Sequence, residues 1–231
     1  MTTHSLKFPN PSECLSPTEF LDVDAPIMNW CIEYLDIRDK SPRVKAIEIF
    51  EFVRDELEFR FEIATDRRAY VASAIVDDGT GFCTQRAIVL CTLARAAGIP
   101  SALLFADLLD RSLSPSLIST LGTQVIHEHG LAALYLDEQW LKVDVGPSPE
   151  HVIRNGYRCV EFDGMSDALM AATKLTNSPH ATYLKFHGAY ADLPFDTMMA
   201  RLAGSYPHLS LEQLSAIQSV RLGTRGGSAN N

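Results

Sequence analysis

The chain has 231 residues, 46% of them hydrophobic and 21% charged, which is the composition of a globular protein long enough to bury a sizeable core. Its formal net charge of −9 argues against a general affinity for nucleic acids or anionic membranes. No run approaches the roughly 18 apolar residues that cross a bilayer, and the first residues lack the apolar core of a secretory signal. We therefore expect a cytoplasmic protein that binds neither nucleic acid nor membrane.

The first part of the chain has mainly helical patterns. In "SPRVKAIEIFEFVRDEL", Ser41 is a good N-cap, Pro42 suits the first helical position and a broad apolar face follows. Another helical pattern ends near Gly79, a natural stop. The expected helices are residues 25–37, 41–57 and 66–79, with a short alternating strand at 58–63.

A further helix, residues 83–97, is followed by patterns typical of strands. Gly98 and Pro100 end this helix, because glycine favours the C-terminal turn and proline prevents continuation. Since helices precede strands, the order favours an α+β fold over an alternating parallel sheet. We expect strands at 101–109, 127–137, 139–146 and 157–164, a polar loop at 110–120, helices at 194–206 and 210–222 (Ser210 as cap), and a disordered tail at 223–231.

Five cysteines occur without a C-x-x-C pair, so the sequence indicates neither a zinc knuckle nor a dithiol redox motif. A disulfide framework is not expected in a cytosolic chain of this size. Four of them are interpreted as small buried hydrophobes: Cys14, Cys31, Cys91 and Cys159.

Cys83 is the exception, because it stands just after two glycines and begins a helix. The unpaired N–H groups and the dipole of a helix N-terminus stabilise a thiolate, which is the nucleophilic form. Gly79 and Gly81 permit a tight turn there and leave room for a substrate. A thiolate that attacks an acyl group also needs a histidine as proton donor and a third residue to orient it.

His129 and Asp144 can supply these two functions. His129 lies near the start of one expected strand and Asp144 lies in the next, so an antiparallel pairing brings side chains on one face within reach. His129 would then present one ring nitrogen to Cys83 and the other to Asp144. Periodicity alone leaves other Cys, His and Asp sets open.

The stretches "GTGFCTQRAIVLCTLARAAGIPSALLFADL", "HGLAALYL" and "QWLKVDVG" together resemble the transglutaminase-like superfamily of papain-type cysteine enzymes. That family has G-x-C at a helix start, R-A-x-G-I-P at the end of the helix, a strand that begins with His, and W-x-x-x-D in the next strand. The matching positions are Gly81–Cys83, Arg95–Pro100, His129 and Trp140–Asp144.

The resemblance covers about residues 40–150, and the helix "RVKAIEIFEFVRDEL" is similar to the one that precedes the family's core. It implies a papain- or transglutaminase-like core, in which N-terminal helices pack on an antiparallel sheet. Residues 1–222 would form one such domain. It also implies that Cys83 is the nucleophile, His129 the general acid and base, and Asp144 the orienting carboxylate, with no cofactor and no metal.

Two local features depart from this pattern or compete with it. Gly130 and Leu131 stand where the family commonly has Ala and Trp, which would leave the cleft a smaller and less polar wall. The Cys83 N–H is a natural oxyanion donor, whereas the second donor is open, since Gln85 could point elsewhere.

His127 and His129 are two residues apart and could share a metal with a carboxylate. No H-E-x-x-H motif supports a metal site, and we interpret His127 as a rim residue.

The sequence therefore predicts a cysteine-dependent acyl-transfer enzyme that hydrolyses a peptide or a small-molecule amide through a Cys83 thioester. The alternatives are a transglutaminase or amide-forming acyltransferase that passes the acyl group to an amine, and a non-catalytic binding module on the same fold. Specificity is expected to depend on residues 109–126 and 163–195, which surround the cleft. Four further histidines are interpreted as surface or structural: His151, His180, His187 and His208.

Overall fold

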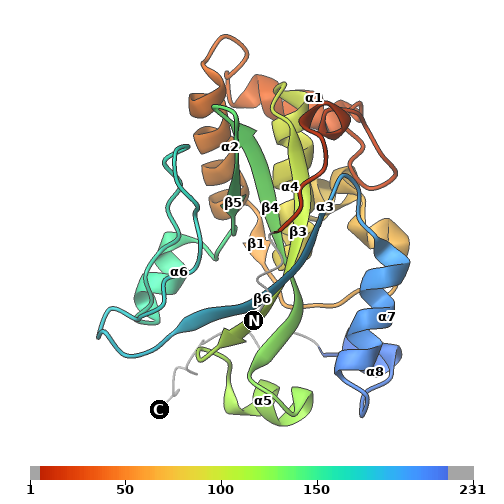
Figure 1. Cartoon of the computed structure of the whole chain (residues 1–231), viewed down its shortest axis with the longest axis vertical. Coiled ribbons are helices and arrows are strands. Elements are labelled where there is room, and N and C mark those ends of the chain that lie inside the picture. Colours follow the sequence, from red (N-terminus) through yellow and green to blue (C-terminus); the bar gives the residue numbers. More distant parts are fainter. Residues whose placement is uncertain (1–5, 218–231) are drawn as a thin grey trace, which may run out of the picture.

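The computed structural model describes residues 6–217, so the tail expected at 223–231 lies outside the described part. Helices come first along the chain and an antiparallel sheet follows, which gives the α+β fold expected from the sequence (Figure 1). The helices of the first half are α1 (Pro26–Tyr34), α2 (Pro42–Glu56), α3 (Ala72–Asp78) and α4 (Cys83–Ala96), with short 3-10 turns at Pro11–Cys14 and Arg67–Tyr70.

The main sheet has four antiparallel strands in the order β5-β4-β3-β6. Two strands of two residues each, β1 and β2, form a separate parallel pair, and β2 comes just before α4 in the chain. The strands are β1 (Glu58–Phe59), β2 (Thr80–Gly81), β3 (Ser101–Asp110), β4 (Val125–Leu136), β5 (Gln139–Val143) and β6 (Ala181–Tyr190).

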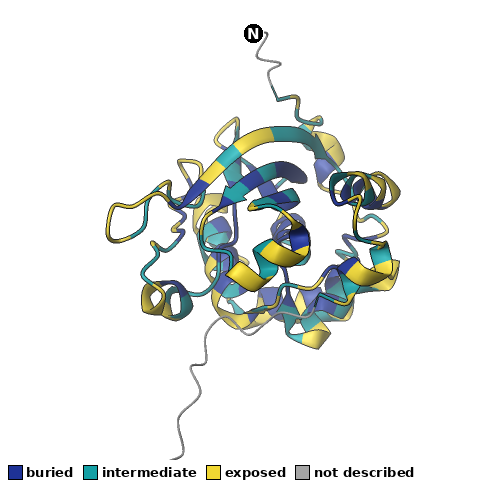
Figure 2. Ribbon diagram, turned by 90° about the horizontal axis from the view of Figure 1, so that it is seen from below, coloured by how far each residue is buried: buried dark blue, intermediate teal, exposed yellow. Residues whose placement is uncertain are grey.

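Helix α4 is the central element of the core, since it contacts α1, α2 and α3 as well as β3 and β4. Twelve of its residues are buried, so α4 is covered by other elements on all sides and is not an amphipathic surface helix. Figure 2 shows the buried residues between the helices and the sheet and the exposed residues on the outer faces. The first turn of α4 is therefore held from several sides, which suits a residue that must keep a fixed position.

Four short helices in the second half surround the sheet. In Figure 1, β6 crosses the molecule between α6 on one side and α7 with α8 on the other. Their bounds are α5 (Pro115–Leu121), α6 (Pro149–Arg154), α7 (Phe195–Ser205) and α8 (Leu211–Ser215). None of the helices within residues 6–217 has the length and apolarity that crossing a membrane would require.

Several expectations about elements were wrong. The polar loop expected at 110–120 contains α5, whose cap is Ser114, and 157–164 is not a strand although its side chains alternate between buried and exposed. That segment packs along α2 instead: the ring of Phe162 lies 5.7 Å from that of Phe50, and Arg54 donates to the Val160 carbonyl. Strand β6 and helix α6 had not been expected at all, and the expected strand at 58–63 contains only the two residues of β1.

Candidate active site

Cys83 is the first residue of α4 and follows β2 directly. Gly79 ends α3 in the left-handed conformation, with φ of 67°, and so turns the chain toward β2. A Cβ on Gly81 would lie 3.1 Å from the Gln85 Cβ, so this glycine allows the chain to pack closely against the start of α4. The Cys83 side chain is only 8% exposed and lines a large cavity.

His129 and Asp144 contact each other, with 2.6 Å between His129 Nε2 and Asp144 Oδ2. The β4–β5 register explains this contact. Ala132 pairs with Val143, so extending the ladder by one residue brings Asp144 opposite Leu131, on the same sheet face as His129. Since Nε2 faces Asp144, Nδ1 is the ring nitrogen left for Cys83.

Cys83 and His129 shift each other's pKa in opposite directions: that of the thiol is lowered and that of the imidazole is raised. Burial alone would raise the pKa of Cys83, but the charge and hydrogen bond of His129 and the Gly130 amide outweigh it, so the pKa is lowered. Burial alone would lower the pKa of His129, but the Asp144 carboxylate and the Cys83 sulfur raise it well above its usual value. The arrangement therefore favours a thiolate beside an imidazolium.

Asp144 has a second partner, Tyr183 of β6, which the sequence did not identify. The Tyr183 hydroxyl donates to Asp144 Oδ2, the oxygen that also faces His129, and accepts a hydrogen bond from the Met170 N–H at 3.2 Å. The backbone N–H of Asp144 donates to the Ala168 carbonyl at 2.8 Å. Because Asp144 is only 2% exposed, these bonds replace water around its carboxylate.

His127 and His129 do not share one site, because β4 is irregular between them. The β3–β4 register shifts between Ala106 and Leu108, and Glu128 adopts a φ of 53°, as in a β-bulge. His127 Nδ1 lies 2.8 Å from Asp107 Oδ1, whereas His129 faces Asp144. Among residues 6–217 no group of three His, Cys, Asp or Glu side chains has the geometry of a metal site.

Asp107 also contacts His187, at 3.0 Å from His187 Nε2, so His127 and His187 share one carboxylate. His180 is 3% exposed, and its ring stacks on Tyr157 with centroids 4.6 Å apart. Each of these histidines contacts a neighbouring side chain, and His180 also lines the cavity beside Cys83. His208 is exposed and contacts the Thr120 carbonyl.

The Gln85 side-chain amide forms hydrogen bonds at the start of α4 and does not serve as an oxyanion donor. Its Oε1 accepts from the Phe82 N–H at 3.1 Å, and its Nε2 donates to the Ala69 carbonyl at 2.7 Å. The Cys83 N–H, in the unpaired first turn of α4, is the donor that the local backbone offers to an oxyanion.

Gly130 serves the packing of β4 on α4 rather than the wall of the cleft. A Cβ at this position would lie 2.5 Å from Thr84 Cα and 2.6 Å from Thr84 Oγ1, distances that no real Cβ tolerates. Neither Gly130 nor Leu131 lines the cavity, so the expectation that these residues make its wall smaller was wrong. The close approach brings the strand that carries His129 next to the helix that begins with Cys83.

Arg86 lies one turn after Cys83, is fully buried and holds three distant segments together. Its guanidinium donates to the carbonyls of Val53, Arg54, Val145 and Gly146 at distances of 2.7 to 3.1 Å. Burial lowers the pKa of Arg86 to about 10, which still leaves the side chain charged at neutral pH. Arg86 thus fixes the backbone just after Asp144.

Cys91, on the same helix, has no comparable surroundings. It is fully buried, and its thiol donates to the Ala102 carbonyl at 3.3 Å. Burial raises the pKa of Cys91 to about 12, so this thiol stays protonated. Its expected role in core packing is confirmed. Cys14 and Cys31 are also buried, and Cys159 is half-buried.

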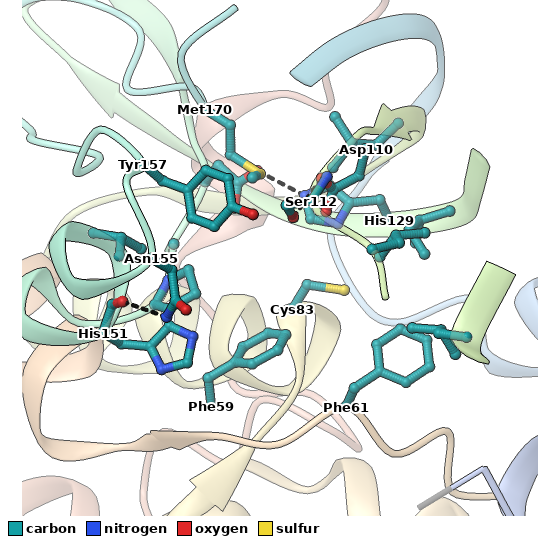
Figure 3. A pocket seen from close by; sticks show the side chains of 18 of the residues that line it. Phe59, Phe61, Cys83, Asp110, Ser112, His129, His151, Asn155, Tyr157 and Met170 are labelled. Carbon is teal, nitrogen blue, oxygen red and sulfur yellow. Dashed lines mark hydrogen bonds and ion pairs between the residues drawn. The ribbon is translucent and has the colours of Figure 1, made fainter. Parts of the chain in front are cut away.

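The cavity beside Cys83 has a volume of about 1090 Å³ and is reached by His129 and Asp144. Figure 3 shows Phe59 and Phe61 on one side of Cys83, and Tyr157, Asn155 and His151 on another. The expected specificity segments, 109–126 and 163–195, contribute in part, through residues between 110 and 126, Met170 and His180. Residues 55–61, 145–160 and 209–217 also line it, and no sequence pattern had placed them there.

Comparisons with known proteins show what the chain is similar to. Residues 33–145 match the model of the transglutaminase-like superfamily. A comparison with curated proteins found no match.

Two solved structures resemble the chain at low sequence identity. A "Putative Cysteine Protease" from Cytophaga hutchinsonii has a TM-score of 0.43 and 13% identity, over 76% of this chain and 52% of that chain. The periplasmic domain of TgpA from Pseudomonas aeruginosa has a TM-score of 0.41 and 20% identity, over 59% and 48%. This chain therefore matches about half the length of each.

Proposed function

Because residues 33–145 belong to the transglutaminase-like superfamily, we propose that the protein is a cysteine-dependent enzyme that hydrolyses an amide through a thioester on Cys83. The family supports a cysteine-dependent enzyme in general, and the reaction and its residues are our proposal. One observation carries it: a buried thiol with a lowered pKa faces a histidine with a raised pKa, and that histidine contacts a buried carboxylate.

In the proposed acylation step, the Cys83 thiolate attacks the carbonyl carbon of the amide. The oxyanion that forms is met by the Cys83 N–H at the N-terminus of α4. The His129 imidazolium then gives its proton to the leaving nitrogen, the C–N bond breaks, and the amine departs. Cys83 is left as a thioester and His129 is neutral.

In the second step, neutral His129 takes a proton from a water molecule, whose oxygen adds to the thioester carbon. The C–S bond breaks, the carboxylic acid leaves, and the thiolate and imidazolium are restored. Asp144 keeps its charge throughout and stabilises the imidazolium, while Tyr183 holds Asp144 in place. We favour water as the acceptor because it is always present, whereas an amine acceptor would need a site of its own.

The test is alkylation by iodoacetamide in the native protein at neutral pH, followed by mass spectrometry. The proposal expects modification of Cys83 well before Cys91, and a Cys83→Ala variant that folds normally but no longer turns over p-nitrophenyl acetate. Equal labelling of both cysteines, or full turnover by Cys83→Ala, would overturn the proposal.

A further inference from the structure

The cavity beside Cys83 is walled mainly by apolar side chains that come from separate parts of the chain. Phe59 and Phe61 come from the segment around β1, and Leu108 and Ile126 come from β3 and β4. Leu117 of α5 and Val152 of α6 extend the apolar surface away from the thiol. Such a wall stabilises a ligand by removing apolar surface from water.

Several polar side chains in this wall already form hydrogen bonds within the protein. Ser112 donates to Asp110 Oδ1 through its N–H at 2.7 Å and through its hydroxyl at 2.6 Å. Asn155 Nδ2 donates to the His151 carbonyl at 2.8 Å, and Gln213 accepts from the Ser210 N–H at 2.8 Å. These bonds use only part of the hydrogen-bonding capacity of each side chain. Because the larger part of the wall surface is apolar, the cavity suits a ligand that presents hydrocarbon to it.

The size of the cavity agrees with an extended ligand. Its volume of about 1090 Å³ slightly exceeds the roughly 300–1,000 Å³ of pockets that bury most of a drug-sized molecule. Three charged residues of the cavity, Asp55, Glu56 and Glu58, lie in an exposed segment, and Asp110, Asp144 and Arg158 also line it. An acyl group that starts at Cys83 meets apolar surface at Phe59 and Phe61, which lie beside the thiol (Figure 3).

We propose, on the basis of the proposed function, that the substrate of Cys83 is an acyl compound whose acyl group carries an extended apolar chain that lies in this cavity. The reacting carbonyl lies at Cys83 and the chain extends past Phe59 and Phe61 toward α5 and α6. Phe59, Phe61 and Leu117 then determine specificity without taking part in the chemistry.

The experiment compares acylation of Cys83 by p-nitrophenyl acetate and by p-nitrophenyl octanoate, the latter below its micelle concentration. The thiolate forms a bond to the acyl carbon, and nitrophenolate leaves with the electron pair of the C–O bond. Each rate constant is divided by that of free cysteine, which corrects for intrinsic ester reactivity. Since each buried methylene contributes about threefold to fourfold, the corrected rate for octanoate should exceed that for acetate by at least about tenfold.

Leu117→Glu places a charge in the cavity wall and should abolish this preference, so that the corrected rates for octanoate and acetate become equal within about twofold. The matched control is Leu175→Glu, because Leu175 is 48% exposed and lies outside the cavity; its preference should equal that of the parent. Binding of octanamide and acetamide to Cys83→Ala, measured by calorimetry, tests the cavity without a reactive thiol and should favour octanamide.

Equal corrected acylation of Cys83 by the two esters, or equal binding of the two amides, would overturn the inference and leave the proposed function standing. Absence of acylation of Cys83 by either ester would overturn the proposed function, and the inference with it.

Discussion

Cys83 and Cys91 lie on the same helix, yet their surroundings give their thiols opposite properties. Both are buried, and burial raises the pKa of Cys91 to about 12. At Cys83 the same effect of burial is outweighed by His129 and by the Gly130 amide, so the pKa is lowered. The difference comes from one strand, because His129 and Gly130 are neighbours in β4.

The first prediction concerns the pH dependence of alkylation at Cys83. Only the thiolate reacts, so a lowered pKa keeps Cys83 reactive at neutral pH, and its rate falls as the pH drops through that lowered value. His129→Ala removes the neighbouring cation and leaves the effect of burial unopposed, so the pKa of Cys83 rises and the rate profile moves to higher pH. The measurement is the rate of iodoacetamide labelling at Cys83 between pH 5 and pH 10, in the parent and in His129→Ala. Identical pH profiles for the two proteins would contradict the interaction between Cys83 and His129.

The second prediction concerns Tyr183 as a positioning residue. Tyr183→Phe removes a hydrogen bond to a buried carboxylate, which contributes about 1.5–3 kcal/mol in such cases, so kcat for p-nitrophenyl acetate should fall by about tenfold or more. KM should not change, and because the same bond stabilises the fold, the melting temperature should fall by a few degrees. Tyr190→Phe is the matched control on the same strand, since its hydroxyl contacts Arg201 instead. A kcat equal to that of the parent, measured at a temperature where the variant is fully folded, would indicate a structural role only.

Tyr183 also shows why part of the site could not be predicted. Cys83, His129 and Asp144 were proposed because their neighbours match a family pattern with fixed spacing. Strand β6 carries no such pattern. It is an edge strand whose pairing with β3 is broken by two register shifts, and most of its residues are half-buried or exposed, so its side chains do not alternate regularly.

At the scale of elements, one local signal recurs three times. Ser41-Pro42, Ser114-Pro115 and Ser148-Pro149 each place serine at the N-cap and proline at the first helical position of a helix. Only α2 was predicted, because fifteen residues display an apolar periodicity. The seven residues of α5 and the six of α6 are too few for periodicity to appear.

The contact between β4 and α4 is the element-level feature on which the site depends most. Gly130→Ala would place a Cβ 2.5 Å from Thr84 Cα, so the strand must move away from the helix, and His129 moves with it. We expect a loss of about 1–3 kcal/mol in the free energy of unfolding and slower alkylation of Cys83 at neutral pH.

Shortening the Thr84 side chain should not restore the stability of Gly130→Ala, because the nearest atom, Thr84 Cα, belongs to the helix backbone. Gly130→Ala combined with Thr84→Ala should therefore remain destabilised. Gly204→Ala is the control: Gly204 lies in α7 with no atom near its missing Cβ, so alanine should be neutral or stabilise by up to about 1 kcal/mol. The free energies come from urea unfolding; a Gly130→Ala variant as stable as the parent would show that the strand and helix can adjust.

At the scale of the whole molecule, the buried guanidinium of Arg86 joins helices α2 and α4 to the segment that follows β5. Arg86 binds the C-terminal end of α2 through Val53 and Arg54, and the segment after β5 through Val145 and Gly146. It lies within the segment that resembles the family, although its packing could not be inferred, since a charged residue in a helical pattern is normally expected at the surface.

The last prediction is that Arg86→Leu destabilises the protein and impairs the site together. Four buried carbonyls lose their donor, which costs about 1–3 kcal/mol for each group left unsatisfied, although local rearrangement would recover part of this. The total loss should exceed about 3 kcal/mol in urea unfolding. Because Val145 and Gly146 directly follow Asp144, turnover of p-nitrophenyl acetate should also fall at temperatures where the variant is still folded.

Two variants make this prediction sharp. Arg86→Lys keeps the charge but cannot reach four carbonyls with a planar group, so it should recover only part of the stability. Arg38→Leu removes an exposed arginine whose partner is Glu33, and it should cost less than about 1 kcal/mol. If Arg86→Leu instead unfolds at the same urea concentration as Arg38→Leu, the carbonyls find other donors, and the link between α2, α4 and the segment after β5 does not depend on Arg86.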